Sequence, residues 1–451
     1  MKQPAIAIFD IGKTNKKLLI FDESYQVLRE ESVQFKESED EDGFPCENLA
    51  LLSQWIKDQL DDCINDSRFD MRAVNVAAYG ASFVNLDGDN KPVTAIYNYL
   101  KPFPQSVQEQ FFERYGGRKR ICLETCSPSL GSLNSGLQLY RLKCEQPGAF
   151  ARVAYALHLP QYISFLMTGA CYSDWSSIGC HTMLWDFSQR GYHHWVTAEQ
   201  VQEKLPGIVS SRSVKSMARH SLKAGIGIHD SSAALIPYLT FIQNEFVLVS
   251  TGTWSISLNP FNDLPLTDAE LENDCLCYLT VDGLPVKASR LFTGYEHDES
   301  VRRLADHFHC DPAKFRSISF NANIWANVTA VRRDLKGELP VTMFTCFEEG
   351  YHALMYEVVQ NQVMSLQRIL TPGIKNVFVD GGFAKNDVYM TILASMLPSY
   401  GVFAASLPQA TAVGAAMAIH EHWNMFPVPE KMLQFSKYIA RTYPRLNSSP
   451  T

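Results

Sequence analysis

The sequence AIAIFDIGKTNKKLLIF, at residues 5–21, predicts a β-hairpin from which much of the architecture can be inferred. The apolar run Ala5–Phe9 enters a short turn, Asp10–Asn15, and a second apolar run, Leu18–Phe21, follows it. Apolar runs joined by a short turn that contains glycine are typical of hairpins. Glycine lets backbone N–H groups approach an anion closely, and the Thr and Asn of the turn add polar groups. We therefore expect this turn to contact phosphate.

The pattern occurs again at residues 246–258, FVLVSTGTWSISL, with Gly252 and Thr253 in the turn. Two such turns facing each other would make a phosphate clamp. No G-x-x-x-x-G-K-[ST] motif occurs in the chain, so the pair indicates nucleotide chemistry without a P-loop. We expect at least one of the three lysines at the first turn to reach phosphate and the others to lie on the surface; they are Lys13, Lys16 and Lys17.

Each half of the chain predicts three strands, a helix and a further strand, which is a mixed α/β pattern. In the first half these are residues 5–10, 17–22, 25–35, a helix with apolar positions from Leu49 to Ile64, and residues 73–78. In the second half they are residues 246–250, 254–258, 275–281, a helix at about 347–370, and residues 376–379, followed by two helices around a strand at 402–404.

Two domains are expected, at residues 1–238 and 239–451. The region from about Lys91 to Ser221 is rich in aromatic residues and irregular, and is predicted to be an insertion that carries substrate contacts. The acidic segment from Glu37 to Asp42 is predicted to be a solvated connection.

Composition excludes several classes of protein. The formal charge of -8 argues against a nucleic-acid-binding protein, and no apolar stretch is long enough to span a membrane. The chain enters a strand almost at once, without the core of a signal peptide. Its 11 cysteines have no zinc-site spacing, so we expect thiols and a cytoplasmic protein. His193 and His194 have no evident partner for a metal and are expected on the surface.

Asp10 ends the first strand just before the glycine turn. A carboxylate there is placed to hold hydrated Mg²⁺ against nucleotide phosphates. The alternative is a turn aspartate that accepts hydrogen bonds from local amides. From the residues alone the two interpretations remain open.

Two later segments have the composition of a nucleotide site. Asp380-Gly381-Gly382 follows a predicted strand, and Asn386 is either a helix N-cap or a contact to the nucleoside. The segment Thr411–Ala416 opens a helix with only small side chains, which indicates tight helix packing, room for the nucleotide, or both.

The segment Gly225–Ala234 contains a short apolar strand with two glycines, then His229 and Asp230, then small residues that begin a helix. Asp230 could accept a hydroxyl proton as that hydroxyl attacks a γ-phosphoryl group. It could also cap the helix. The two roles are compatible, because a helix N-terminus also stabilises a carboxylate.

Together these motifs resemble the FGGY family of carbohydrate kinases, within the actin, heat-shock-70 and hexokinase superfamily. The resemblance covers essentially the whole chain, in order, and favours the rhamnulokinase and fuculokinase branch over glycerol kinases. It implies two RNase-H-like α/β domains around a central ATP and sugar cleft, with Asp230 as general base and Asp10 near Mg²⁺. It implies ATP contacts from these residues: Gly12, Thr14, Asn15, Lys17, Gly252, Thr253, Gly381, Gly382 and Asn386. It implies sugar contacts from these: Gly80, Ser82, Asn134, His229 and Asp230.

The chain departs from the family on the sugar side. Rhamnulokinases usually carry an acid where Ser82 follows Gly80, and many members carry Trp-x-Asp-x-Arg where this chain has Tyr97–Lys101. These changes leave the sugar open, although a ketose phosphorylated to a 1-phosphate is favoured. A small sugar is the expected partner, with no nucleic acid and no membrane, and a homodimer is a candidate assembly. The alternatives are a nucleotide-clamp switch protein and a sugar-binding regulator without turnover.

Overall fold

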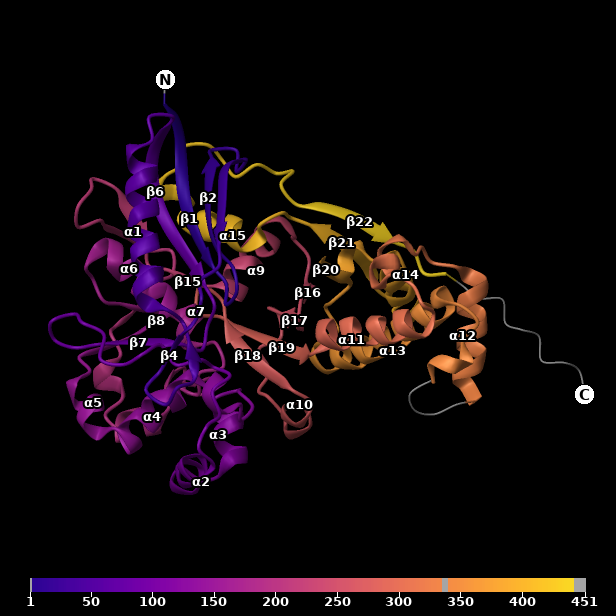
Figure 1. The fold of residues 1–451 in the computed structure, drawn as a ribbon, viewed down its shortest axis with the longest axis horizontal. Coiled ribbons are helices and arrows are strands. Elements are labelled where there is room, and N and C mark those ends of the chain that lie inside the picture. The colour runs from indigo at the N-terminus through magenta and orange to yellow at the C-terminus, as the bar shows by residue number, and fades with distance from the viewer. Residues whose placement is uncertain (1, 335–339, 442–451) are drawn as a thin grey trace, which may run out of the picture. The chain divides into compact units, whose positions relative to one another are not determined.

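The computed structural model describes residues 2–334 and 340–441, and the chain divides into two compact units (Figure 1). Unit 1 comprises Met1–Phe241, Asp263–Val286 and Pro408–Met432. Unit 2 comprises Ile242–Asn262, Lys287–Leu407 and Leu433–Thr451. The first division, after Phe241, lies close to the expected boundary, and two later segments of the chain return to unit 1.

Unit 1 is built on a seven-stranded mixed sheet. Its strands lie in the order β13 (Val214–Ser216), β14 (Lys223–Gly225), β6 (Phe69–Ala78), β1 (Gln3–Ile11), β2 (Lys16–Asp22) and β3 (Val27–Val33), and β15 (Ile228–His229) also pairs with β6. The β1–β2 and β2–β3 pairs are antiparallel, whereas β6 is parallel to β1, β14 and β15. The predicted hairpin and the strand at residues 73–78 are therefore confirmed.

Helices cover this sheet because its central strands are apolar throughout. Residues 5–9 of β1 are fully buried. The predicted helix is α1 (Leu49–Asn65), which buries Leu52, Ile56 and Leu60 at four-residue spacing and is capped by Asn48. Further helices that contact β6 are α6 (Leu159–Thr168), α9 (Asp230–Phe241) and α15 (Ala410–Ala418).

The region expected to be irregular instead contains a series of short helices. It contains α2 (Gln105–Arg114), α3 (Arg118–Glu124), α4 (Ser135–Glu145), α5 (Pro147–Arg152), α7 (Trp175–Ile178) and α8 (His194–Ala198). Short strands join them: β7 (Phe83–Leu86), β8 (Tyr155–His158), β9 (Ser173–Asp174), β10 (Trp185–Asp186), β11 (Gly191–Tyr192) and β12 (Ile208–Val209). These helices are too short to show a long apolar period, but their aromatic residues form a core of their own around Phe111, Tyr140 and Trp195.

The acidic segment is not simply solvated, contrary to the sequence prediction. It forms the short pair β4 (Ser38–Glu39) and β5 (Pro45–Cys46). The Asp40 carboxylate is buried and lies 2.6 Å from Lys101 Nζ, and Asp42 lies 2.6 Å from the same ammonium. Tyr97 donates a hydrogen bond to Glu41. The segment is ordered because its carboxylates neutralise Lys101 and accept from Tyr97.

Unit 2 repeats the strand order of unit 1. Its strands lie in the order β19 (Pro285–Leu291), β17 (Ser255–Asn259), β16 (Phe246–Thr251), β20 (Asn376–Gly381), β21 (Gly401–Ser406) and β22 (Gln434–Tyr438). The β16–β17 hairpin is antiparallel, and β20 is parallel to β16 and β21. In each unit, a hairpin strand thus pairs in parallel with the strand that follows the long helix.

The helices of unit 2 are α11 (Thr293–His307), α12 (Ala322–Asp334), α13 (Phe347–Ile369) and α14 (Asp387–Met396). The predicted long helix is α13. The strand expected at residues 275–281 is β18 (Cys275–Leu279), which contacts α7 and α10 (Asp268–Glu272) in unit 1. The sequence prediction missed β19, which pairs with β17 and is the third strand beside the second hairpin.

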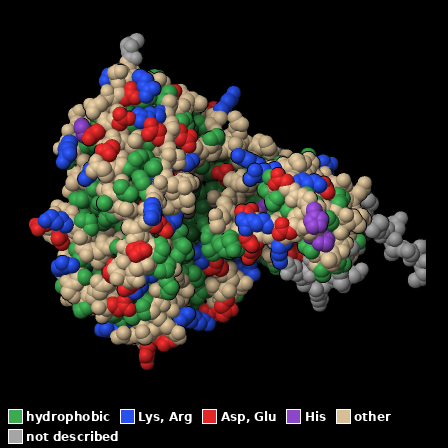
Figure 2. All heavy atoms as spheres, in the orientation of Figure 1, with side chains coloured by type: hydrophobic (Ala, Val, Ile, Leu, Met, Phe, Trp, Pro, Cys, Tyr) green, Lys and Arg blue, Asp and Glu red, His purple; other side chains and the backbone are tan. Residues whose placement is uncertain are grey.

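Acidic and basic side chains are interspersed over the surface that Figure 2 shows. This distribution agrees with the net charge of -8 and provides no broad basic surface on that face. Among the described residues, no helix is both long enough and apolar enough to cross a membrane.

The packing of α15 against α9 leads to a test of stability. A Cβ added to Gly414 would lie 1.8 Å from the backbone oxygen of Ala233 in α9. Gly414→Ala should therefore lower the free energy of unfolding by about 1–3 kcal/mol, measured by urea denaturation. Gly148→Ala, in α5 and with nothing within 4 Å, is the control. It should leave stability unchanged or raise it by up to ~1 kcal/mol. Equal effects of the two substitutions would contradict this account of the packing.

Candidate functional site

Three strand ends meet at one edge of the unit 1 sheet. Asp10 of β1 pairs with Ala77 of β6, and His229 of β15 pairs with Ala78 on the other side of β6. Parallel pairing brings the carboxyl ends of these strands together, as at the ligand sites of many α/β sheets. It therefore brings Asp10 close to Asp230, the residue after β15.

The Asp10 carboxyl is strongly affected by this position. Burial, followed by the negative charge of Asp230, raises its pKa from the usual 3.8 to about 6. Lys17 opposes that shift. The partly buried group thus carries a charge for which the protein alone compensates incompletely, which is the property expected of a carboxylate that holds a cation.

The turn after Asp10 is closed by a hydrogen bond from Gly12 N to Asn15 O, and Thr14 and Asn15 are exposed. Lys17 is partly exposed and pairs with Glu30 at 3.4 Å. The lysines that do not contact phosphate were expected on the surface, and for Lys16 this prediction was wrong. Lys16 is buried and its ammonium lies 2.9 Å from the Glu47 carboxylate, because a charge at this depth needs a partner.

Asp230 lies at the first turn of α9, directly after β15. Its Oδ1 accepts from the Ser231 backbone N at 2.6 Å and lies 3.3 Å from His229 Nε2. Its side chain is 35% exposed, so an outside molecule can reach the carboxylate. The carboxylate lies at the positive end of the helix dipole. Both roles that the sequence left open, a helix-terminal carboxylate and an accessible proton acceptor, are therefore compatible with this geometry.

Glycines make the approach of His229 sterically feasible. A Cβ on Gly80 would lie 2.8 Å from His229 Cδ2. Gly227 has φ +88, and a Cβ there would lie 2.4 Å from the backbone oxygen of Pro160. Gly225 packs so closely on Asn75 that a Cβ would lie 2.1 Å from its Oδ1. The glycines of this segment let β15 enter a crowded sheet.

The structure adds neighbours of His229 that sequence reasoning missed. The Tyr278 ring is stacked on it, with centroids 6.0 Å apart, and Cys180 Sγ lies 3.0 Å from Nε2. Ser176 Oγ accepts from the His229 backbone N at 2.9 Å. These residues come from separate segments of the chain without a spacing pattern, so nothing in the sequence linked them to the histidine.

Asn134 and Ser82, which are predicted to face the sugar, make buried hydrogen bonds within unit 1. Asn134 is fully buried, and its Nδ2 lies 2.9 Å from His181 O and 3.0 Å from Ser127 Oγ. Ser82 is also buried and donates to Tyr97 O at 3.3 Å. Gly80, His229 and Asp230 lie at the strand ends. The side chains of Asn134 and Ser82 stabilise the loops around those strand ends.

A pocket of about 830 Å³ lies wholly within unit 2. Thr251, Gly252, Thr253, Gly294, Gly382 and Asn386 contribute to its lining, with Phe315 and Phe383 as aromatic surfaces and Arg316 and Lys385 as cations. The turn that contains Gly252 and the glycine pair Gly381-Gly382 are joined in this pocket, because Gly382 N donates to Thr251 O at 3.1 Å. The size and mixed polarity of the pocket suit a small ligand.

Gly381 and Asn386 shape this pocket. Gly381 has φ +87, and a Cβ there would lie 1.9 Å from Thr251 O, so the close approach of β20 to the turn requires glycine. Asn386 is the N-cap of α14, accepting from Tyr389 N at 3.1 Å, and also lines the pocket. The predicted N-cap is confirmed.

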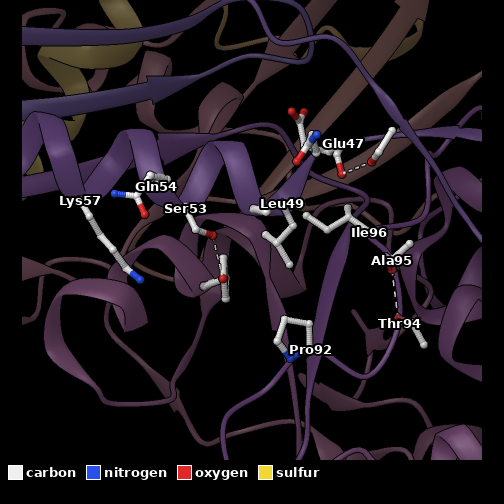
Figure 3. A pocket seen from close by; sticks show the side chains of 13 residues that line it. Glu47, Leu49, Ser53, Gln54, Lys57, Pro92, Thr94, Ala95 and Ile96 are labelled. Atoms are coloured by element: carbon white, nitrogen blue, oxygen red, sulfur yellow. Dashed lines mark hydrogen bonds between the residues drawn. The ribbon is translucent and has the colours of Figure 1, made fainter.

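A further pocket, of about 530 Å³, lies in unit 1 at the start of α1 (Figure 3). Glu47, Ser53, Lys57 and Thr94 are among its lining residues, and none of the predicted catalytic or nucleotide-contacting residues is. Glu47 is engaged by Lys16 and by the Tyr79 hydroxyl. This pocket is therefore separate from the proposed chemistry.

The expectations for the cysteines and the paired histidines had different outcomes. All eleven cysteines lie in the described part of the chain and none forms a disulfide. The surface placement is confirmed for His194, which is exposed, and was wrong for His193, which is fully buried with its Nε2 2.9 Å from Glu124. Glu124 lies in α3, far away in sequence, so the pairing arises only on folding.

The duplicated sheet with acidic residues at its strand ends and a glycine-lined pocket is the arrangement of a phosphotransferase of the actin-like superfamily. Residues 5–234 match the FGGY family of carbohydrate kinases, N-terminal domain, and residues 243–328 match the carbohydrate kinase FGGY, C-terminal domain. The chain belongs to the FGGY family of carbohydrate kinases. These enzymes transfer a phosphoryl group from ATP to a sugar hydroxyl.

Individual relatives are distant. A rhamnulokinase from Halalkalibacterium halodurans is 23% identical, with 96% of each chain covered. A carbohydrate kinase from Novosphingobium aromaticivorans has a similar structure, with a TM-score of 0.78 and 21% identity over 96% of both chains. A ligand-bound xylulose kinase from Lactobacillus acidophilus has a TM-score of 0.78 and 16% identity over 97% of this chain and 94% of its own. At these identities the structural matches establish the fold and leave the sugar open.

The raised pKa of Asp10 makes a prediction about pH. The folded protein holds a proton on Asp10 more strongly than the unfolded chain, so ionisation costs stability as the pH rises from about 4 through about 6. Asp10→Asn should therefore raise the free energy of unfolding at pH 7.5 by about 1–3 kcal/mol. The gain should shrink as the pH falls towards 4, because the wild-type carboxyl is then protonated too. Urea denaturation at several pH values measures both.

Asp89→Asn is the matched control, because Asp89 is an exposed turn residue. It should change stability little at either pH. A loss of stability on Asp10→Asn at pH 7.5 would show that the Asp10 charge is well compensated in the folded protein.

Proposed function

We propose that this carbohydrate kinase uses Mg·ATP to phosphorylate a ketose, with Asp230 as the general base and a ketose 1-phosphate as the product. The observation that carries the proposal is the position of Asp230, a partly exposed carboxylate at a helix N-terminus beside His229 and close to Asp10. A general base has to be accessible and within hydrogen-bond reach of the hydroxyl that it deprotonates.

In the proposed reaction, the carboxylate of Asp230 accepts the proton of the sugar hydroxyl. The hydroxyl oxygen then forms a bond to the γ-phosphorus of ATP, the bond from that phosphorus to the bridging oxygen breaks, and ADP leaves with the electron pair. His229 and the loop at Gly80 orient the sugar, and Asn134 and Ser82 support the surrounding backbone. Positioning and charge stabilisation account for most of the catalysis in such reactions.

The nucleotide is proposed to occupy the pocket of unit 2. Thr251, Gly252 and Thr253, which line the pocket, would offer donors to phosphate. Gly382 and Asn386, which also line it, would border the nucleoside together with the neighbouring Gly381. In unit 1, Gly12, Thr14, Asn15 and Lys17 would contribute further phosphate contacts. The two units correspond to a sugar-binding N-terminal domain and an ATP-binding C-terminal domain.

Asp10 fits a magnesium site. Its pKa is raised by burial and by Asp230, so a bound cation would relieve both effects. Mg²⁺, when bound, neutralises charge on the phosphates. Asp10 would hold it through one carboxylate and leave Asp230 available to the sugar.

Two observations support a ketose. The 23%-identical relative is named rhamnulokinase, and the similar structure from Lactobacillus acidophilus is named xylulose kinase. In this chain Lys101 is buried with Asp40 and Asp42, so it is not available to a sugar in the way that the family arginine is expected to be. Specificity for the sugar should therefore differ in detail from that of rhamnulokinases.

Eleven reduced cysteines support a cytoplasmic location.

The base is tested by Asp230→Asn. Loss of a general base typically costs at least ~100-fold in rate, so phosphorylation of the best substrate in a panel of ketoses and polyols should fall by that factor. ADP binding, measured by calorimetry, should persist. Unchanged phosphorylation would overturn the role of Asp230. Absence of activity of the wild type on the whole panel would favour the switch or regulator alternatives.

The nucleotide pocket is tested by Gly382→Leu. A Cβ at Gly382 meets nothing within 4 Å, and the residue lines the pocket, so leucine should fill space meant for the ligand. We expect ADP affinity to fall by at least ~10-fold, about 1.4 kcal/mol, with an unchanged melting temperature. Gly207→Leu, also with nothing within 4 Å but outside the pocket, should leave affinity unchanged. Equal affinity of both variants would place the nucleotide elsewhere.

A further inference from the structure

Three side chains with metal-binding atoms lie together next to Asp230. Cys180, His181 and His229 each offer one ligand atom, and these atoms lie within 4.8 Å of one another. All three residues are buried. Cys180 Sγ is 3.0 Å from His229 Nε2, and Asp230 Oδ1 is 3.3 Å from the same nitrogen. Of the three, only His229 has a part in the proposed phosphoryl transfer.

We propose that Cys180, His181 and His229 bind Zn²⁺ reversibly, with Asp230 as the fourth ligand, and that the bound zinc blocks phosphoryl transfer. Binding of zinc stands on the cluster itself. The effect on activity rests on the proposed function, because it follows from occupation of the general base.

The donor set selects zinc over magnesium. A thiolate and two imidazoles are soft or borderline ligands that favour Zn²⁺, whereas Mg²⁺ favours oxygen ligands. Millimolar Mg·ATP should therefore not compete for the cluster. In a tetrahedral zinc site, bond lengths of about 2.0–2.3 Å place neighbouring ligand atoms roughly 3.5 Å apart. The separations of Cys180 Sγ and Asp230 Oδ1 from His229 Nε2, 3.0 and 3.3 Å, are close to that spacing, and the ligand atoms of Cys180, His181 and His229 lie within 4.8 Å of one another.

Surrounding groups already orient the ligands. His181 Nδ1 lies 3.1 Å from Leu133 O, so the Nδ1–H donates to this carbonyl and Nε2 is the nitrogen that would bind a metal. Histidines that bind metals commonly donate their other N–H to a carbonyl in this way. The His229 ring is held between the close approach at Gly80 and the stacked ring of Tyr278.

One feature of His229 lowers the expected affinity of the cluster for zinc. Its Nδ1 is buried and has no hydrogen-bond partner among the described residues. When Nε2 binds a metal, the ring proton has to lie on Nδ1, where it meets no acceptor. The unpaired N–H costs free energy, so zinc should bind more weakly here than in a structural zinc centre. The site therefore suits a metal that binds and leaves rather than a resident one.

A second cluster in unit 1 serves as a comparison. Glu124, His193 and His194 also bring three ligand atoms within 4.8 Å of one another. The Glu124 carboxylate is already paired there, with Arg120 at 2.7 Å and His193 at 2.9 Å. This cluster contains no thiol, so we expect it to contribute little to zinc binding.

The test uses the full chain in a buffer with a non-thiol reductant. Zinc affinity is measured by competition with a fluorescent zinc chelator, and kinase activity by chromatographic detection of ADP, which avoids coupling enzymes that zinc could inhibit. The wild type should bind one Zn²⁺ at the cluster and lose activity as the site fills. Removal of a ligand in Cys180→Ser or His181→Gln should each weaken binding by at least ~10-fold, and inhibition should weaken in parallel, relative to each variant's own zinc-free rate.

Matched controls are Cys144→Ser, which removes an exposed thiol, and His194→Asn, which removes a ligand of the second cluster. Both should bind zinc as the wild type does. The proposal is overturned if Cys180→Ser and His181→Gln, each folded by circular dichroism, retain wild-type zinc affinity, or if His194→Asn alone loses it. Asp230→Asn should also weaken zinc binding. That measurement needs no sugar, so it separates a failure of the zinc site from a failure of the kinase proposal.

Discussion

The parallel pairing of β6 with β1 on one side and with β15 on the other is the constraint on which unit 1 depends. Its register sets Asp10 opposite Ala77 and His229 opposite Ala78. Two carboxylates that are far apart in the sequence, Asp10 and Asp230, are thereby brought near each other at one sheet edge. Burial, followed by the negative charge of Asp230, raises the pKa of Asp10 to about 6. The same register therefore places a carboxyl with a raised pKa beside a second carboxylate.

Unit 2 contains the same parallel pairing, but a different kind of site forms at the strand ends. There β16 pairs in parallel with β20, and the register sets Thr251 opposite Gly381. This edge has glycine where the edge of unit 1 has acids, so a pocket forms rather than a charged centre. One strand order thus places carboxylates at the strand ends of one unit and a pocket at those of the other. The difference arises from a few residues at the strand ends.

Much of the fold could be predicted, because its signals are local. Alternation of apolar runs with glycine turns gave both hairpins, and four-residue apolar spacing gave α1 and α13. The helices of residues 105–168 were missed, since each is only six to eleven residues long and their cores are shared between segments. The third strand of unit 2, β19, was missed because it carries two basic residues, Lys287 and Arg290, which are buried with its apolar residues.

The motifs of the candidate site could be predicted from the sequence. The residues that surround those motifs in the folded protein could not. Asp10, Asp230 and the glycines follow from strand-end positions and from resemblance to a family. The sequence alone determined the repeated order of strands and helices and the residue types that end each strand, because both depend on neighbours along the chain. Tertiary structure decided that Lys16 and Lys101 are buried with carboxylates and that Cys180 and Tyr278 contact His229. Those contacts join segments tens to hundreds of residues apart, and only the packing of the folded chain determines which side chains share a buried space.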